Sequence, residues 1–179
     1  MKKTAVLLYP QFSEYELSVA LSILMQGKKP IVTVGLNNQP IKGESGLSCI
    51  ADTTVDEIIF TEVDSLLLPG CMDIGTLINE QKLFEFIRQI TENETIIASI
   101  SSSPFLLAKA GVLNGKKFTV GLTMEAIEKL GVFEKENYSE DLVVQDGNII
   151  TARGKAFIRF GICFGKALNL EFDEKWYKE

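Results

Sequence analysis

The chain has 179 residues, 46% of them hydrophobic, with 18 lysines and arginines against 24 aspartates and glutamates, three cysteines and no histidine. A chain of this length and apolar content can fold around one hydrophobic core, which excludes a disordered or low-complexity protein. The formal charge of −6 argues against nucleic-acid binding, because that needs clustered lysine and arginine. Without histidine, the commonest transition-metal ligand and the usual general base near neutral pH are missing, so we expect no metal and no cofactor.

The apolar runs are a few residues long, far short of the roughly 20 residues that span a bilayer, so we expect no membrane span. The start of the chain has two lysines before an apolar stretch but no small-residue cleavage site, and we interpret it as a strand. Cys49, Cys71 and Cys163 are odd in number and lack metal-ligand spacing, which favours free thiols in a reducing compartment. We therefore expect a cytoplasmic protein with a single domain over residues 1–179.

Short apolar runs alternate with amphipathic segments along the chain. The first half predicts strands at 5–9, 31–36 and 66–68, a short extra strand at 47–50, and a helix at 14–26 that Gly27 ends. The second half predicts a helix around residues 83–90, a strand at 95–100, a helix at 105–110 opened by Pro104, and a short strand at 118–120. It continues with a helix capped by Thr123, a hairpin of 142–145 with 149–151, and a last helix from about 155.

This alternation predicts an α/β fold, in which helices cover both sides of a mostly parallel, doubly wound sheet. The phenylalanines at 157, 160 and 164 lie on one face of the last helix, where they favour a core position over a partner surface. Ligands of such sheets bind beyond the carboxyl ends of the strands. The loops after Tyr9, Leu68 and Ile100 are therefore the places where we expect a site.

Ser101 follows a buried strand and precedes a helix. A sharp strand-to-helix turn would lift Ser101 to the tip of the sheet as a nucleophile elbow, with the N–H groups of the next residues as donors. The local alternative is that Ser102 or Ser103 simply caps the helix.

Glu16 and Cys71 each have a functional and a local interpretation. Glu16 lies three residues after Ser13, which is the spacing of a capping box; alternatively it is a buried carboxyl that hydrogen-bonds the Ser101 side chain. Cys71 follows Gly70, whose flexible backbone could direct the next N–H into the site. As a free cysteine it is otherwise a small buried hydrophobic residue.

Taken together, these segments resemble the ThiJ/PfpI family, which includes the parkinsonism-associated protein deglycase, PfpI-type intracellular proteases and bacterial stress chaperones. The resemblance spans nearly the whole chain and rests on four segments, at residues 9–16, 67–70, 98–104 and 146–154. It implies a flavodoxin-like three-layer α/β/α sandwich, shared with class I glutamine amidotransferase domains. It also implies a homodimer.

By this resemblance, Ser101 stands where the family has its reactive cysteine, and Glu16 stands where it has the glutamate bonded to that thiol. The places of the family's histidine read Ser102 and approximately Gly121, and neither can act as a base. A serine without a base is not activated as a nucleophile. We therefore expect a non-catalytic or atypical member with a role in stress that binds a small carbonyl or carboxylate ligand.

In this interpretation the ligand is held by Glu16, Gly70, Cys71 and Ser102 around the degenerate elbow at Ser101. The alternative is a glyoxalase, deglycase or hydrolase acting on small electrophiles, with Cys71 as the compensating catalytic residue. Lys42, Arg153 or Lys155 could supply positive charge, but the sequence does not place them.

Overall fold

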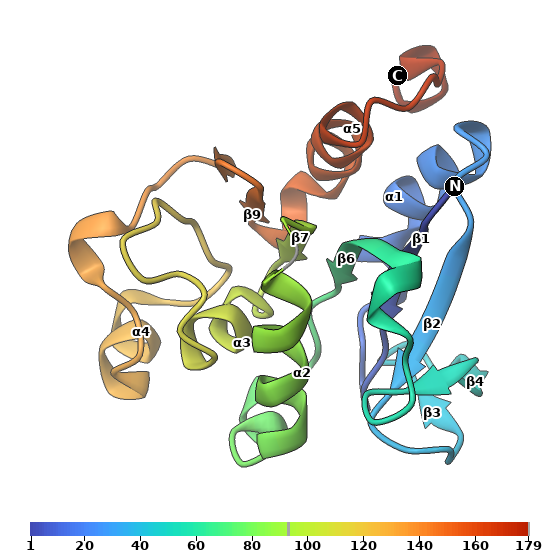
Figure 1. The fold of residues 1–179 in the computed structure, drawn as a ribbon. Helices are drawn as coiled ribbons and strands as arrows, with labels where there is room; N and C mark the ends of the chain where they lie inside the picture. Colours follow the sequence, from blue (N-terminus) through green and yellow to red (C-terminus); the bar gives the residue numbers. More distant parts are fainter. Residues whose placement is uncertain (93, 179) are drawn as a thin grey trace.

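A seven-stranded sheet in the order β5-β2-β1-β6-β7-β9-β8 forms the centre of the computed structural model, which describes residues 1–92 and 94–178 (Figure 1). Neighbouring strands are parallel except for β8 and β9, which form an antiparallel hairpin. The strands are β1 (Lys3–Leu7), β2 (Ile31–Gly35), β5 (Thr53–Thr54), β6 (Val63–Leu68), β7 (Ile96–Ile100), β8 (Val143–Asp146) and β9 (Ile149–Ala152). This confirms the predicted α/β fold with a mostly parallel sheet.

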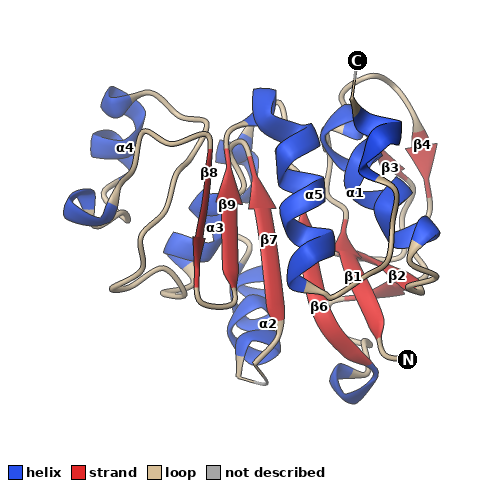
Figure 2. Ribbon diagram, turned by 90° about the horizontal axis from the view of Figure 1, so that it is seen from above, coloured by secondary structure: helices blue, strands red, loops and turns tan. Residues whose placement is uncertain are grey.

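Helices cover both faces of this sheet, as Figures 1 and 2 show. On one face α1 (Glu14–Gln26) packs against α5 (Phe157–Ala167), and on the other lie α2 (Gln81–Thr91) and α3 (Pro104–Lys109). The remaining α-helix, α4 (Met124–Leu130), lies beyond the β8 edge. The 3-10 helices are at Phe60–Glu62, Ile74–Leu77, Lys135–Asn137, Gly154–Ala156 and Glu174–Tyr177.

Glycines allow the close packing of α1 against α5. A Cβ added to Gly161 would lie 2.8 Å from Val19 Cγ1 and 2.9 Å from the backbone nitrogen of Ala20. One turn later, a Cβ on Gly165 would overlap Ile23. Helix α1 carries Glu16 into the site, so this contact also fixes the place of that carboxyl.

Three short segments lie next to one another beyond the carboxyl ends of β1 and β6. Ser13 N–H donates to Gly70 O (2.9 Å) and Met72 N–H to Gln11 O (3.1 Å), so residues 11–13 and 70–72 run side by side. On the other side, Gln11 N–H donates to Lys42 O at 2.8 Å. Lys42 belongs to the third segment, the antiparallel hairpin of β3 (Ile41–Lys42) and β4 (Ser48–Cys49).

Most predicted elements are present, with ends shifted by a few residues. The helix at 14–26 and the hairpin before the last helix are confirmed. Phe160 and Phe164 are fully buried, as expected for core residues. The strand predicted at 118–120 is wrong, because Phe118 makes only an isolated bridge with Tyr138.

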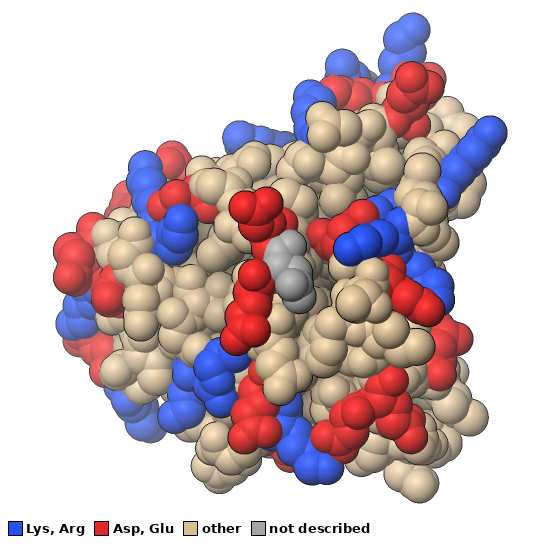
Figure 3. Space-filling view, viewed as in Figure 1, with Lys and Arg blue, Asp and Glu red and all other residues tan. Residues whose placement is uncertain are grey.

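Charges on the face seen in Figure 3 are mixed, with lysine and arginine side chains interspersed among aspartate and glutamate. No helix formed by residues 1–92 and 94–178 is long and apolar enough to cross a membrane.

Candidate functional site

Ser101 directly follows β7 in a strained conformation, with φ at +64° in the left-handed region. Its N–H donates to Ala152 O at 2.8 Å, and its carbonyl accepts from Gly121 N at 2.6 Å. A left-handed residue other than glycine costs about 1–2 kcal/mol, and such strain concentrates at functional sites. The turn is therefore a sharp elbow rather than a relaxed helix cap.

Ser103 occupies the N-cap position of α3, yet its side chain caps no N–H of the helix. Its fully buried hydroxyl accepts from Ile100 N at 2.9 Å, lies 2.7 Å from Ser99 Oγ, and has Ile100 O at 2.7 Å and Leu68 O at 3.0 Å as acceptors for its one proton. The interpretation of Ser103 as a cap is wrong, because the hydroxyl turns back to the end of β7 and faces β6 instead of the helix.

Ser102 is no side-chain cap either. Its hydroxyl lies between the two backbone groups of Cys71, accepting from the N–H at 3.2 Å and facing the carbonyl oxygen at 3.3 Å. The Cys71 N–H therefore points at the Ser102 hydroxyl and not at Ser101. Among the backbone N–H groups at the elbow, that of Ser102 has no acceptor in the part of the chain that the structure describes.

The predicted capping box between Ser13 and Glu16 is wrong. Ser13 is at the N-cap of α1 but caps no N–H with its side chain, and its hydroxyl donates to Glu44 Oε1 at 2.7 Å. Glu16 points away from the helix start, toward the loop after β6, where Oε2 accepts the N–H of Gly70 at 2.7 Å. Only 2% of Glu16 is exposed, so the carboxyl lies inside the site.

The Tyr15 hydroxyl donates to Glu16 Oε1 at 3.3 Å, and the Ser101 side chain borders the same glycines as the carboxyl. Burial raises the pKa of Glu16, the polar groups of Gly70, Ser101 and Tyr15 oppose this, and the charge of Glu44 adds to it. The net result is a pKa above the ordinary value, so Glu16 holds a proton to higher pH than an exposed glutamate.

Two glycines leave room for this cluster. A Cβ on Gly154 would lie 2.6 Å from Glu16 Oε1, 3.2 Å from Ser101 Oγ and 3.3 Å from Tyr15 Oη. A Cβ on Gly70 would lie 2.6 Å from Glu16 Oε2 and 2.7 Å from Ser101 Cβ. Three polar oxygens thus converge beside the Gly154 Cα.

Cys71 lies next to the elbow, but its thiol is poorly suited to nucleophilic attack. Burial raises its pKa to about 11; the hydrogen bond with Ser102 opposes this, and the charges of Asp73 and Glu16 add to it. Near neutral pH only about one such thiol in ten thousand is ionised, and the thiolate is the reactive form.

The sequence interpretation missed Tyr15. Its ring lies edge-on against Phe157, with centroids 5.5 Å apart, and 49% of the residue is exposed. The only signal in the sequence was its place directly before Glu16. Arg153 donates to Thr119 Oγ1 at 3.3 Å and to the Tyr138 hydroxyl.

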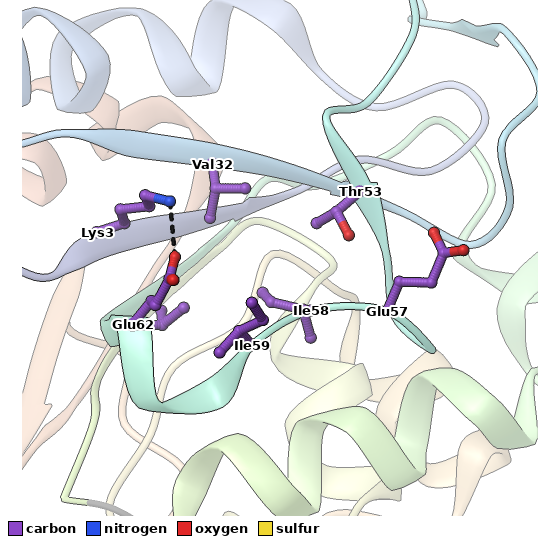
Figure 4. A pocket seen from close by; sticks show the side chains of 8 residues that line it. Lys3, Val32, Thr53, Glu57, Ile58, Ile59 and Glu62 are labelled. Atoms are coloured by element: carbon purple, nitrogen blue, oxygen red, sulfur yellow. Dashed lines mark hydrogen bonds and ion pairs between the residues drawn. The ribbon is translucent and has the colours of Figure 1, made fainter.

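A separate hollow of about 160 Å³ lies at the other end of β1 (Figure 4). Lys3 and Glu62 form an ion pair of 2.8 Å there, and Ile58 and Ile59 supply apolar walls. Because β1 begins at Lys3, this hollow is at the amino end of the strand, away from the edge where parallel sheets bind ligands. Within the described residues, no three His, Cys, Asp or Glu side chains gather as a metal site requires.

Replacing Glu16 by Gln is expected to change the pH dependence of stability. The raised pKa means that the folded state binds the Glu16 proton more tightly than the unfolded chain does. This stabilisation is fully present below the unfolded pKa, near the ordinary value of 4.5, and is lost as the pH rises through the folded pKa. Relative to Glu16→Gln, the wild type should therefore lose stability in urea unfolding as the pH rises above the ordinary value of 4.5. A difference that does not vary with pH would contradict the raised pKa.

Comparison with known proteins gives matches over most of the chain. A family model described as the DJ-1/PfpI family matches residues 2–165. Protein DJ-1alpha of Drosophila melanogaster is 31% identical over 157 residues, which are 86% of this chain and 70% of the fly protein. Isonitrile hydratase of Pseudomonas putida is 28% identical over 169 residues, 92% of this chain and 69% of that enzyme. Other relatives are named as deglycases and as proteases.

Among solved structures, a two-domain protein of Anabaena variabilis matches with a TM-score of 0.83 and 26% identity. The match covers 98% of this chain but 51% of that protein, which contains a DJ-1/ThiJ/PfpI-like domain and a ferritin-like domain.

Proposed function

The chain belongs to the DJ-1/PfpI family, and from this premise we propose that it is an atypical member that binds a small carbonyl compound at Ser101 and Glu16, without thiol chemistry. The observation that carries the proposal is the elbow itself. A serine in the left-handed conformation lies beside a buried glutamate, in a chain that contains no histidine. The geometry of a reactive site is present, while the groups that activate a nucleophile are not.

Two features support binding over catalysis. A serine hydroxyl needs a base to become a nucleophile, and Glu16 is a weak base for so weak an acid. Gly121, near the place of the family's histidine, packs so closely on the elbow that a Cβ there would lie 3.0 Å from Ser101 Cα. This position therefore has little space for a side chain.

The alternative, turnover through Cys71, is less favoured because its pKa of about 11 keeps the thiol protonated near neutral pH. Because relatives are named as a deglycase and as an isonitrile hydratase, this catalytic alternative is tested beside the binding proposal. Loss of methylglyoxal turnover in Cys71→Ala would favour this alternative, whereas activity absent from both proteins, or unchanged in the variant, would contradict it.

Ligand binding is tested by thermal shift against small aldehydes, ketones, amides and carboxylates. A ligand at 100 times its Kd stabilises the folded state by about 2.7 kcal/mol, which raises Tm by several degrees. Gly154→Ala should abolish the shift, because the added methyl enters the space between Glu16, Ser101 and Tyr15. Gly115→Ala is the matched control, since a Cβ there meets nothing within 4 Å. A panel without any shift, or an equal shift in both variants, would contradict the proposal.

We also propose a homodimer in the cytoplasm, as the family resemblance implies. Light scattering that finds a monomer at all concentrations would contradict the dimer.

A further inference from the structure

The structure places Lys42, one of the candidate positive charges, on the wall of a groove. The groove has a volume of about 480 Å³ and is formed by residues 10–11, residues 40–44 and Met72. It lies beyond the carboxyl end of β1, at the edge where parallel sheets bind their ligands. Small-molecule sites have volumes of about 300–1,000 Å³, so a small ligand fits this groove.

Hydrogen bonds hold one wall of the groove against the start of α1. The carboxylate of Glu14 accepts the N–H of Ser45 at 3.0 Å and that of Leu47 at 3.3 Å, in the turn that follows β3. Glu44 N–H donates to Phe12 O at 3.0 Å. The wall is therefore formed before a ligand arrives, which lowers the entropy cost of binding.

Lys42 and Glu44 carry opposite charges on this wall. Neither residue takes part in an ion pair within residues 1–92 and 94–178. Glu44 Oε1 accepts the Ser13 hydroxyl at 2.7 Å, and in the same part of the chain Oε2 has no donor. Lys42 is exposed and Glu44 is partly exposed, so a ligand can reach both. The groove thus offers one positive and one negative group to a ligand.

The rest of the groove has an apolar wall, made by Pro10, Pro40 and Met72. All three residues are exposed, Met72 by 69%. A hydrocarbon group of a ligand would remove part of this apolar surface from water, which favours binding.

The two charges restrict the class of ligand. An ion of a single charge is attracted by one of Lys42 and Glu44 and repelled by the other, and an uncharged ligand pairs with neither. A zwitterion pairs with both, through charge-assisted hydrogen bonds. We propose that the groove binds a small amino acid whose carboxylate pairs with Lys42, whose ammonium pairs with Glu44 and whose apolar side chain packs on the apolar wall. This site is distinct from the elbow and does not depend on the function proposed there.

L-Leucine and two of its derivatives test the two charges. L-Leucinamide lacks the carboxylate and N-acetyl-L-leucine lacks the ammonium, while both keep the side chain. Titrations followed by the amide NMR signals of the protein are made at about pH 6.5, where free α-amino groups are protonated, and a millimolar Kd is expected for leucine. Each derivative should bind about 5-fold more weakly, because one charge contact in a solvated groove is lost. Glycine, without a side chain, should bind about 10-fold more weakly.

Two variants assign the charges to their residues. Lys42→Gln should weaken the binding of leucine and N-acetylleucine by about 5-fold and should not weaken that of leucinamide. Glu44→Gln should weaken leucine and leucinamide and not N-acetylleucine, and its amide oxygen can still accept from the Ser13 hydroxyl. Lys135→Gln is the control for a lost positive charge, because Lys135 pairs with Glu128 of α4, beyond the β8 edge (Figure 2).

Equal binding of leucine and its two derivatives would overturn the inference, as would a variant that weakens all three ligands to the same extent. Absence of leucine binding would also overturn it. The thermal-shift panel decides separately on the proposed function, because its aldehydes, ketones, amides and carboxylates are not zwitterions.

Discussion

Ser101→Cys is expected to become the most reactive thiol of the chain. Burial raises the pKa of all three native cysteines, that of Cys71 to about 11. At pH 8 a thiol with a pKa of 11 is about 0.1% ionised, whereas one near the ordinary value of about 8.5 is roughly a quarter ionised. Because a thiolate of lower pKa is also less nucleophilic, a thiol at the partly exposed elbow should react with iodoacetamide about 10- to 20-fold faster than Cys71.

The carboxyl of Glu16 determines whether this expectation holds. An ionised Glu16 would raise the pKa of a neighbouring thiol, and burial opposes this ionisation by raising the pKa of Glu16 itself. Peptide mass spectrometry in a Cys71→Ala background follows the label at position 101, and Glu16→Gln is the comparison. Labelling at position 101 no faster than at Cys71 in the wild type would show that the elbow does not activate a nucleophile.

Gly161→Ala is expected to destabilise the protein by about 2 kcal/mol, although alanine is the better helix former. The added methyl would lie 2.8 Å from Val19 Cγ1 and 2.9 Å from the backbone nitrogen of Ala20, and backbone atoms cannot turn away. The overlap costs about 3 kcal/mol, of which about 1 kcal/mol is offset by helix propensity. For a chain of this size, Tm should fall by about 4–8 °C in calorimetry.

Gly115→Ala separates packing from backbone strain. A Cβ there meets nothing within 4 Å, but φ is +68°, so only the cost of a left-handed alanine remains, about 1 kcal/mol. A Gly161→Ala protein as stable as the wild type would contradict the tight contact between α1 and α5.

Local sequence patterns predicted the elements whose stability is local or whose partners are adjacent. The helix from Glu14 to Gln26 was predicted at its correct ends, because its apolar spacing and Gly27 are signals within the segment itself. The strand at 118–120 was predicted from the same kind of pattern and is absent. Thr119 N–H donates to the side chain of Thr151 in β9. Residues 118–120 therefore contact β9 through a side chain and form no ladder of backbone hydrogen bonds with it.

The predictions for the candidate site also depended on whether the contacts of a residue can be inferred from its neighbours in sequence. The capping patterns at Ser13 and Ser103 were read from the residues that follow them, whereas the Ser13 hydroxyl bonds Glu44 and the Ser103 hydroxyl turns back to Ile100 and Leu68. Resemblance to a family could point to Glu16 and Ser101, because it carries information about the folded arrangement. Tyr15 was missed, because the direction of its hydroxyl depends on where Glu16 and Gly154 lie in space.

The pairing of the elbow with β9 determines when the site can form during synthesis. Ser101 N–H bonds Ala152 O, and Gly154 borders Glu16, so the last wall of the site comes from a segment made long after α1 and β7. A nascent chain that has exposed only β1 to β7 carries Ser101 on an unpaired sheet edge, where its strained backbone has no partner. The site is therefore complete only after the hairpin of β8 and β9 has been made, and a chain interrupted before it would present an unpaired β7 edge to other chains.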